Sequence, residues 1–455
     1  MTTTRRSAHH CASRAAAAAA AAGVALVAAC ASPGGTTDEE GARGFAEAQQ
    51  EEGSPITVWV DASRAAAADA FTAANPDVEV DVVTYDGSAN GSDSFKTKIG
   101  LLDRAGDGWP DVVFSTQNND AAWASQGANG QQPFAAVLDQ GLIGDDVLGG
   151  FTEGSLDPCT VDGSVYCLRN DLAQGVLWYD QSLMDEFGYE LPTTWEEYGE
   201  LSARVAEEHP GYITGSVGDP WTPEIFFWAS RCQANDVEGP STMVVDTTSP
   251  ECQRAAELVD AGVEQGWLTD LSVFSPEFVQ QYSGKVVMMP GPAWFAGAIF
   301  DNPDSLAVPP GQIGVAPPLP WGDEDAVTGN VGGGTWFVSS HSRNLEAATQ
   351  FVEFVTTADD YQVEQAPGYP AYAPAADKWV SGQEDSGYYA SDLAGLTEAA
   401  PLVWSGWGAP AFSQEAIWAK TMQPLLTSGQ PLTDELDTWQ QAIEDQAQVF
   451  GYSVQ

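Results

Sequence analysis

Three short apolar runs decide the fold class of this chain: Ile56-Thr-Val-Trp-Val60, Val78-Glu-Val-Asp-Val-Val83 and Pro110-Asp-Val-Val-Phe114. Each run is rich in β-branched residues, which is typical of a β-strand. Helices are predicted between them, over residues 65–74 and 96–102. Strands joined through helices pair in parallel, and the helices cover the faces of the sheet. The sequence therefore predicts an α/β fold.

The same alternation continues along the rest of the chain. Further strands are predicted over residues 175–179 and 286–289, and further helices over 195–207, 251–266 and 345–357. About 400 residues belong to this folded part, which is more than one hydrophobic core commonly supports. Two lobes are therefore expected, with no second long linker.

The N-terminus has the pattern of an export signal. Arg5, Arg6 and Arg14 form a basic start, and an alanine-rich apolar run leads to Val27-Ala-Ala-Cys30, which resembles the lipobox of bacterial lipoproteins. Residues 1–29 are therefore predicted to be a lipoprotein signal peptide, and Cys30 the lipidated residue. The alternatives are a plain secretory signal and a membrane-spanning anchor, although the apolar run is shorter than the roughly 20 residues that span a bilayer. The pair Arg5-Arg6 leaves twin-arginine export open beside general secretion.

Residues 30–54 contain Gly, Ser, Thr, Ala and acidic residues, with almost no large apolar side chains. Such a composition does not build a core, so the segment is predicted to be a flexible tether between the lipid and the folded body. The protein is accordingly expected outside the cytoplasm, on the outer face of the cell membrane.

The chain is strongly acidic, with 16 Lys and Arg against 65 Asp and Glu and a formal net charge of −49. Loss of residues 1–29 removes three arginines and no acids, which leaves 13 basic side chains and a net charge of −52. This charge repels nucleic acids and anionic bilayers and favours a monomer. We interpret the acidity as surface solvation, and whether it reflects a saline habitat stays open.

Four cysteines remain after the signal peptide and Cys30, and they form two pairs of near neighbours in the sequence. Cys159 and Cys167 flank a predicted hairpin centred on Gly163, which places them opposite each other. Cys232 and Cys252 then pair by elimination. Zinc is the alternative, but none of these cysteines has CxxC spacing.

Several motifs occur after Pro55 in a fixed order. They are Val58-Trp-Val-Asp61, Asn75-Pro-Asp77, Pro110-Asp-Val-Val113, Pro192-Thr-Thr-Trp-Glu-Glu-Tyr198, Gly284-Lys-Val-Val-Met-Met-Pro-Gly-Pro292, Ile313-Gly-Val-Ala-Pro-Pro-Leu-Pro320 and Gly332-Gly-Gly-Thr-Trp-Phe-Val338. In this order they resemble the motifs of the family 1 extracellular solute-binding proteins, the group that includes maltose-binding protein. The chain departs from the family at Leu168, where a proline is usual, and at Trp294, which lies one residue later than usual.

The resemblance implies the two-lobed periplasmic-binding-protein fold of type II, in which each lobe is a mostly parallel sheet flanked by helices and the lobes hinge on crossing segments. It implies the first part of lobe 1 over residues 55–167, the first part of lobe 2 over 168–328, and a return crossing with C-terminal helices shared between the lobes over 329–455. It also implies capture of a mono- or oligosaccharide and its delivery to the permease subunits of an ABC importer.

A sugar ring has an apolar face and a rim of hydroxyls, so a sugar site combines aromatic rings with polar side chains. The predicted ligand contacts are polar or aromatic residues at positions that resemble cleft positions of the family. They are Ser63, Arg64, Asn118, Asp120, Asn170, Asp171, Trp221, Trp294, Tyr372, Trp404 and Trp407. For the polar residues the alternative is a helix cap or a turn.

Enzymes are the main alternative class. After the signal peptide only His209 and His341 remain, far apart, and the sequence lacks HExxH, GxSxG and P-loop motifs. No catalytic residue, metal or cofactor is expected, although a glycosidase needs only two carboxylates and stays a remote alternative. A binding protein for a peptide, an amino acid or a polyamine is the nearer alternative. Sugar is favoured because the candidates are aromatic and amide-rich with one arginine; which sugar depends on loop geometry.

Overall fold

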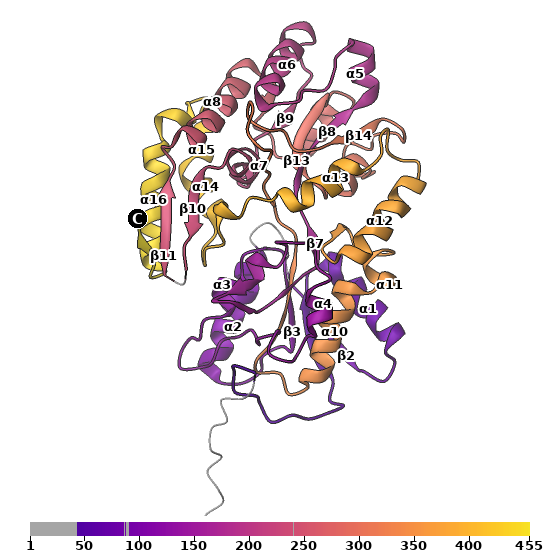
Figure 1. The fold of residues 1–455 in the computed structure, drawn as a ribbon, viewed down its shortest axis with the longest axis vertical. Helices are drawn as coiled ribbons and strands as arrows, with labels where there is room; N and C mark the ends of the chain where they lie inside the picture. Colours follow the sequence, from indigo (N-terminus) through magenta and orange to yellow (C-terminus); the bar gives the residue numbers. More distant parts are fainter. Residues whose placement is uncertain (1–42, 86, 88–90, 240) are drawn as a thin grey trace, which may run out of the picture. The chain divides into compact units, whose positions relative to one another are not determined.

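The computed structural model describes residues 43–85, 87, 91–239 and 241–455 (Figure 1). The predicted signal peptide and Cys30 lie outside the described residues. The chain divides into Met1–Glu39 and Glu40–Gln455, and the structure described below is that of the second unit.

Lobe 1 is built on a five-stranded sheet in the order β2-β1-β3-β15-β6. Strands β1 and β2 pair in parallel, as do β1 and β3, so the predicted parallel pairing of the first three strands is confirmed. The return strand β15 is antiparallel to both of its neighbours, β3 and β6. The bounds are β1 (Ile56–Val60), β2 (Val80–Thr84), β3 (Val112–Ser115), β6 (Leu168–Arg169) and β15 (Thr335–Val338).

Alternate side chains of this sheet enter two different cores. Val112 and Phe114 of β3 pack in the cluster that contains Phe71, whereas Val113 packs with Phe95 on the other face. This follows from the two-residue period of a strand, and helices cover both faces. The helices of lobe 1 are α1 (Ala65–Ala74), α2 (Gly91–Ala105), α3 (Ala121–Ala124), α4 (Asp145–Leu148), α10 (Leu345–Thr357) and α11 (Asp359–Gln362).

The central sheet of lobe 2 has the order β13-β8-β14, with β8 (Gly175–Asp180) antiparallel to both β13 (Met288–Pro292) and β14 (Ile313–Ala316). The prediction of a mostly parallel sheet is therefore wrong for the central sheet of this lobe. Strand β8 leads away from the crossing, while β13 ends beside the start of β8, where Pro292 pairs with Gly175. Strands β13 and β14 both run back towards the crossing and are therefore antiparallel to β8.

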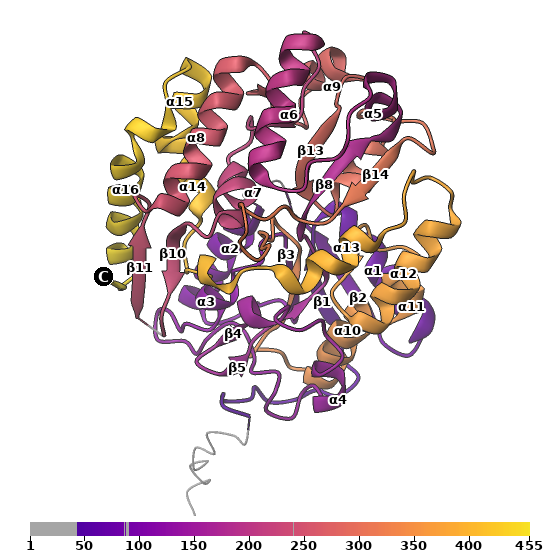
Figure 2. The same ribbon diagram turned by 45° about the horizontal axis from the view of Figure 1, so that its top comes forward.

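The remaining elements of lobe 2 surround this sheet, and α8, α14, α15 and α16 line one flank (Figure 2). The helices are α5 (Gln181–Phe187), α6 (Trp195–Glu208), α7 (Thr222–Ala229), α8 (Pro250–Gln265), α9 (Pro276–Tyr282), α13 (Ala394–Ala399), α14 (Gln414–Thr421), α15 (Gln423–Ser428) and α16 (Leu436–Val449). The small strands are β9 (Gly215–Ser216), β10 (Gln233–Val237), β11 (Thr242–Asp246), β12 (Leu268–Thr269) and β17 (Ser453–Val454).

Two crossing segments run side by side between the lobes. The amide of Gly175 donates to the carbonyl of Gly329 at 3.0 Å, and the amide of Val331 donates to the carbonyl of Ala173 at 3.0 Å. Strand β7 (Asp171–Leu172) pairs with β16 (Tyr369–Pro370) just before the first crossing, and α12 (Ala373–Asp385) follows the second strand. The two crossings therefore lie against each other between the lobes, which is an arrangement that allows hinge motion.

The end of the expected tether packs on lobe 1. Phe45 is buried, and the side chain of Gln132 exchanges two hydrogen bonds with the backbone of Ala46, at 2.9 and 2.8 Å. Glu51 forms an ion pair with Arg343, which precedes α10. The expectation of a flexible segment up to residue 54 is therefore corrected for residues 45–54, because Phe45 supplies an apolar anchor that composition alone does not reveal.

Both predicted disulfides are present. Cys159 bonds Cys167 with a Cα–Cα distance of 5.0 Å, and Cys232 bonds Cys252 at 4.6 Å. The first closes the hairpin of β4 (Thr160–Val161) and β5 (Ser164–Val165), whose turn contains Gly163 at φ 79°. The second fastens α8 to the turn after α7. Each bridge therefore lies within one lobe and leaves the hinge free.

Candidate functional site

A cavity of about 600 Å³ lies between the two lobes. We call it the cleft cavity. Lobe 1 contributes the region of α3 and the segment 153–162, and lobe 2 contributes residues of α7, β10 and the loop 400–409. Its lining residues come from both lobes, so a molecule that fills the cavity contacts both of them.

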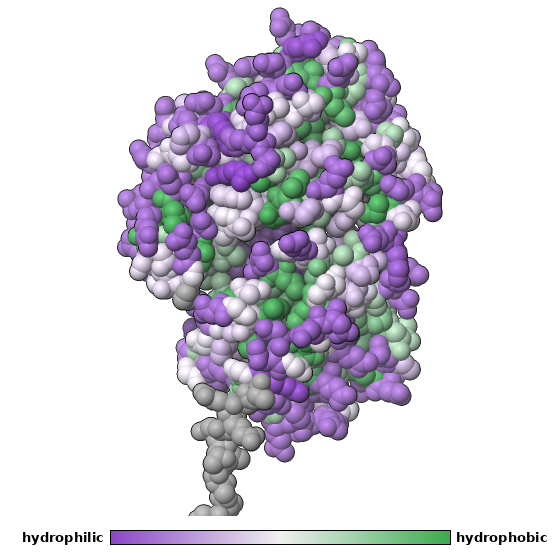
Figure 3. Space-filling model, in the orientation of Figure 1, coloured by the Kyte–Doolittle hydropathy of each residue, from purple (hydrophilic) through white to green (hydrophobic). Residues whose placement is uncertain are grey.

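Aromatic and amide side chains share the walls of the cleft cavity. Trp228 and Trp404 line it from lobe 2, and Tyr452 also lines it. Asn118 donates from Nδ2 to the carbonyls of Asn330 and Gly332, at 2.7 and 3.1 Å, and so joins the wall of lobe 1 to the second crossing. Hydrophilic residues cover much of the visible surface, with hydrophobic patches on both lobes near their junction (Figure 3).

Three of the predicted ligand contacts line this cavity or a small space that adjoins it: Asn118, Trp404 and Trp407. Trp407 is buried and stacks on Trp228 with ring centroids 5.4 Å apart and an interplanar angle of 11°. The indole N–H of Trp228 donates to the carbonyl of Trp404 at 2.6 Å. The loop that carries both predicted tryptophans is thus held by a third tryptophan on α7.

Three other predicted contacts, Arg64, Asn170 and Asp171, form a charged network at the start of the first crossing. The carboxylate of Asp171 accepts from the Asn170 side chain at 2.9 Å and lies 3.8 Å from the guanidinium of Arg64. Asn170 in turn accepts from the indole of Trp336 at 2.9 Å. Arg169 is fully buried beside them, and burial lowers the pKa of its guanidinium to about 10. These groups are engaged with one another and serve to join the crossing to lobe 1.

The remaining polar candidates have local roles. Asp120 is buried, forms an ion pair with Lys96 and accepts from the hydroxyl of Ser115 at 2.5 Å. Ser63 is exposed in the short helical turn that follows β1, and Asp61 caps that turn. Neither Asp120 nor Ser63 lines the cleft cavity.

The other aromatic candidates lie outside the cleft cavity. Trp221 is buried edge-on against Trp294, with centroids 5.8 Å apart. Trp294 is half-buried, stacks on Phe274 and donates to the carbonyl of Val331 at 2.8 Å. Tyr372 packs edge-on against Phe151 at the start of α12.

Sequence reasoning missed Trp228, Asn330 and Tyr452 as lining residues. Trp228 lies in α7, where seven of eight residues are buried, so its sequence context resembles a core helix. Tyr452 lies only three residues from the end of the sequence, directly before β17, which pairs with β11. No local pattern marks these residues, because their approach to the cavity depends on long-range packing.

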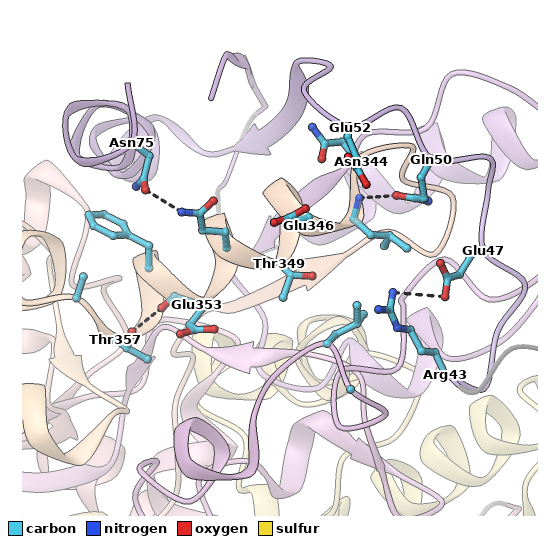
Figure 4. A pocket seen from close by; sticks show the side chains of 16 residues that line it. Arg43, Glu47, Gln50, Glu52, Asn75, Asn344, Glu346, Thr349, Glu353 and Thr357 are labelled. Carbon is cyan, nitrogen blue, oxygen red and sulfur yellow. Dashed lines mark hydrogen bonds and ion pairs between the residues drawn. The ribbon is translucent and has the colours of Figure 1, made fainter. Parts of the chain in front are cut away.

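A second hollow, of about 690 Å³, lies on lobe 1 between the N-terminal segment and α10 (Figure 4). Its polar lining comes from Arg43, Glu47 and Gln50 on one side and from Thr349 and Glu353 on the other. It contains neither Trp nor Tyr and touches only lobe 1. Although it is larger than the cleft cavity, Phe354 is the one aromatic residue among its described lining residues, and none of its lining residues belongs to lobe 2.

The chain matches the model of the family described as bacterial extracellular solute-binding protein over residues 54–362. Its fold is similar to that of a binding protein from B. animalis subsp. lactis Bl-04, solved with β-1,6-galactobiose, with a TM-score of 0.71 and 19% identity over 89% of this chain and 100% of that one. It is equally similar to the galacto-N-biose-/lacto-N-biose I-binding protein of Bifidobacterium longum: TM-score 0.71, 19% identity, 90% and 100% coverage.

In sequence, the chain is 22% identical to an arabinooligosaccharide-binding protein of Halalkalibacterium halodurans over 255 residues. The match covers 53% of this chain and 55% of that relative, about half of each.

The two hinged lobes and the cavity between them define the type II solute-binding fold. The chain belongs to the bacterial extracellular solute-binding protein family, since the family match covers most of its length. Membership places it outside the cytoplasm. In the part of the chain that the structure describes, no helix combines the length and the apolar character needed to cross a membrane.

Proposed function

We propose that this protein is a lipid-anchored carbohydrate-binding protein that captures a mono- or oligosaccharide in the cleft cavity and delivers it to the permease of an ABC importer. It binds without turnover and acts as a monomer. The proposal rests mainly on one observation: a cavity of about 600 Å³ whose walls combine tryptophan rings with amide side chains and which both lobes share.

The chemistry of the walls supports a sugar. Pyranose rings place their C–H faces against aromatic rings and their hydroxyls against amides and carboxylates. Trp404 supplies a half-buried ring, and Asn118 and Asn330 supply amides on the opposite side. The relatives named for arabino-oligosaccharides, β-1,6-galactobiose and lacto-N-biose support the same ligand class. Trp221 and Trp294 stay proposed as contacts for a longer ligand that extends beyond the cleft cavity.

A thermal-shift panel of saccharides tests the ligand class. The panel includes arabino-oligosaccharides, β-1,6-galactobiose, lacto-N-biose and malto-oligosaccharides, with peptides and amino acids as the opposing set. We expect at least one saccharide to raise the melting temperature and to be recovered unhydrolysed. Stabilisation by peptides or amino acids alone would refute the assignment to sugars. Release of new reducing ends would show hydrolysis and would favour a glycosidase instead.

Trp404→Ala should weaken binding of the saccharide found in that panel by about five- to 150-fold, because loss of a stacking ring costs about 1–3 kcal/mol. Isothermal titration calorimetry measures the change. Trp59→Ala is the matched control, since Trp59 is also half-buried but lies on β1, outside the residues that line the cleft cavity. Equal affinities of the wild type and Trp404→Ala would show that the ring does not contact the ligand.

We propose that ligand binding closes the lobes about the two crossings, so that the permease reads the closed form. The second crossing contains Gly333 at φ 77°, where a Cβ would lie 2.3 Å from Nη2 of Arg169. Only glycine fits this conformation and this contact. The backbone there can rotate without moving a side chain.

Export with residues 1–29 as the signal and lipidation at Cys30 are part of the proposal, on the lipobox-like sequence Val27-Ala-Ala-Cys30. Cys30→Ala should abolish lipid attachment and shift the protein from the membrane fraction to the soluble extracellular fraction. Fractionation and metabolic labelling with a fatty acid measure the shift. Undiminished membrane association of Cys30→Ala would contradict the anchor.

A further inference from the structure

A second, smaller space of about 20 Å³ adjoins the cleft cavity, and Asn118 and Trp228 line both. We call it the acidic pocket. It lies between the first turns of α7 and α14, and residues 117–119 of lobe 1 close its third side. A volume above roughly 10–15 Å³ holds one water-sized group, so the acidic pocket accepts a single small group.

Two carboxylates line the acidic pocket, Glu224 in the first turn of α7 and Glu415 in the first turn of α14. Glu415 is only 7% exposed, and its Oε2 atom has no hydrogen-bond partner in the described structure. Asp219 adds a third negative group nearby, although its own carboxylate accepts from Ser272 Oγ at 2.7 Å and from the amide of Val273 at 3.0 Å.

No basic side chain of the described residues forms an ion pair with any of these three acids. Burial, helped by Asp219, raises the pKa of Glu415 to about 8. Burial and the neighbouring Glu415 raise the pKa of Glu224 well above its ordinary value. An unpaired buried carboxylate is costly, so this pair either holds a proton or receives a positive charge from outside.

We infer that the ligand of the cleft cavity carries a protonated primary amine, and that this ammonium group enters the acidic pocket between Glu224 and Glu415. An ammonium ion is water-sized and donates up to three hydrogen bonds, which suits a small space that two carboxylates line. A divalent metal suits it less well, because no cluster of three or more His, Cys, Asp or Glu among the described residues is placed to hold one.

This inference deepens the proposed function and rests on it: the saccharide is an amino sugar. The proton balance follows from the raised pKa of Glu415. When the carboxyl group of Glu415 is protonated in the free protein, entry of the ammonium group expels that proton to solvent and leaves an ammonium–carboxylate pair. Binding of an uncharged sugar releases no proton.

The chitosan disaccharide and cellobiose form a matched pair of probes, because they differ only in having amines or hydroxyls at carbon 2. Putrescine is a third probe, an amine without a sugar ring. Calorimetry at mildly acidic pH, in two buffers of different ionisation enthalpy, gives affinities and proton release together. We expect the chitosan disaccharide to bind at least about tenfold more tightly than cellobiose, with release of a proton.

Glu415→Gln should remove both this preference and the proton release. Glu277→Gln is the matched control, since Glu277 occupies the same position after a serine N-cap in α9 but is exposed. The melting temperature of each unliganded variant reports on folding. We expect no decrease for Glu415→Gln, because the amide removes an unpaired buried acid.

Each outcome is decisive. Equal or tighter binding of cellobiose overturns the inference and leaves the sugar proposal standing. Binding of putrescine but of neither disaccharide, if lost in Glu415→Gln, upholds the amine site and counts against sugar. The inference also fails if none of the three probes binds, if Glu415→Gln retains the preference, or if ammonium chloride alone stabilises the protein as much as the chitosan disaccharide does.

Discussion

Asp171→Ala should lower the free energy of unfolding by about 3–5 kcal/mol, because it removes one partner from a buried set of charges. Asp171 is 3% exposed, and its carboxylate accepts from the amide of Gly334 at 3.0 Å as well as from Asn170. Its loss leaves the fully buried Arg169 without the nearby negative charge that stabilises its charged form. It also removes the hydrogen bond from Gly334 that joins the second crossing to β7.

Urea denaturation of Asp171→Ala measures this effect, with Asp185→Ala as the control. Asp185 is exposed on α5 and accepts a hydrogen bond from the side chain of Gln181, so its loss should cost less than about 0.5 kcal/mol. A variant at Asp171 that keeps wild-type stability but loses ligand affinity would show that the carboxylate contacts the ligand, as its sequence position suggested. Loss of stability is the outcome that the hydrogen bonds predict.

Trp228→Ala should lower the free energy of unfolding by about 3–5 kcal/mol and should also weaken ligand binding, because the Trp228 side chain is buried in lobe 2 and also lines the cleft cavity. Its ring supports Trp407 by stacking, and its N–H holds the carbonyl of Trp404. Without it, the loop 400–409 loses its support and the wall of the cleft cavity becomes mobile. The return crossing is affected too, since Gly329 packs directly against α7.

Trp228→Phe separates the two contributions. Phenylalanine keeps a ring against Trp407 but leaves the carbonyl of Trp404 without its donor, which costs about 1–3 kcal/mol. Thermal melting and calorimetry with the same saccharide measure stability and affinity in each variant. If Trp228→Ala altered affinity no more than Trp228→Phe did, the loop would keep its conformation without the stacked ring.

Local sequence determined much of the fold. The helices predicted over 65–74 and 345–357 have those bounds in the structure. The strand predicted over 78–83 begins two residues later, at Val80. Helix α6 begins at Trp195 because Thr194 accepts from the amide of Glu197, a contact between residues only three positions apart. Caps and apolar periodicity act over a few residues, so a single sequence contains them in full.

The site was predictable only in outline. Arg64, Asn170 and Asp171 are residue types that commonly bind sugar hydroxyls. In the structure they pair with one another, and Asn170 also accepts from Trp336, which lies 166 positions away. Asp120 similarly meets Lys96 from another element. Whether a polar side chain faces a ligand or a protein partner depends on which distant groups arrive beside it. Sequence spacing does not contain that information.

The sequence alone determined the α/β class, the two lobes, the two disulfide pairs and the family, because these depend on periodicity, cysteine spacing and motif order. Tertiary structure decided the antiparallel sheet of lobe 2, the seating of residues 45–54 on lobe 1 and the walls of the cleft cavity. It also decided that Glu224 and Glu415, 191 positions apart, line one pocket. The physical reason is the same in each case: packing and charge pairing are properties of neighbours in space, and the neighbours that matter here lie far apart in the sequence.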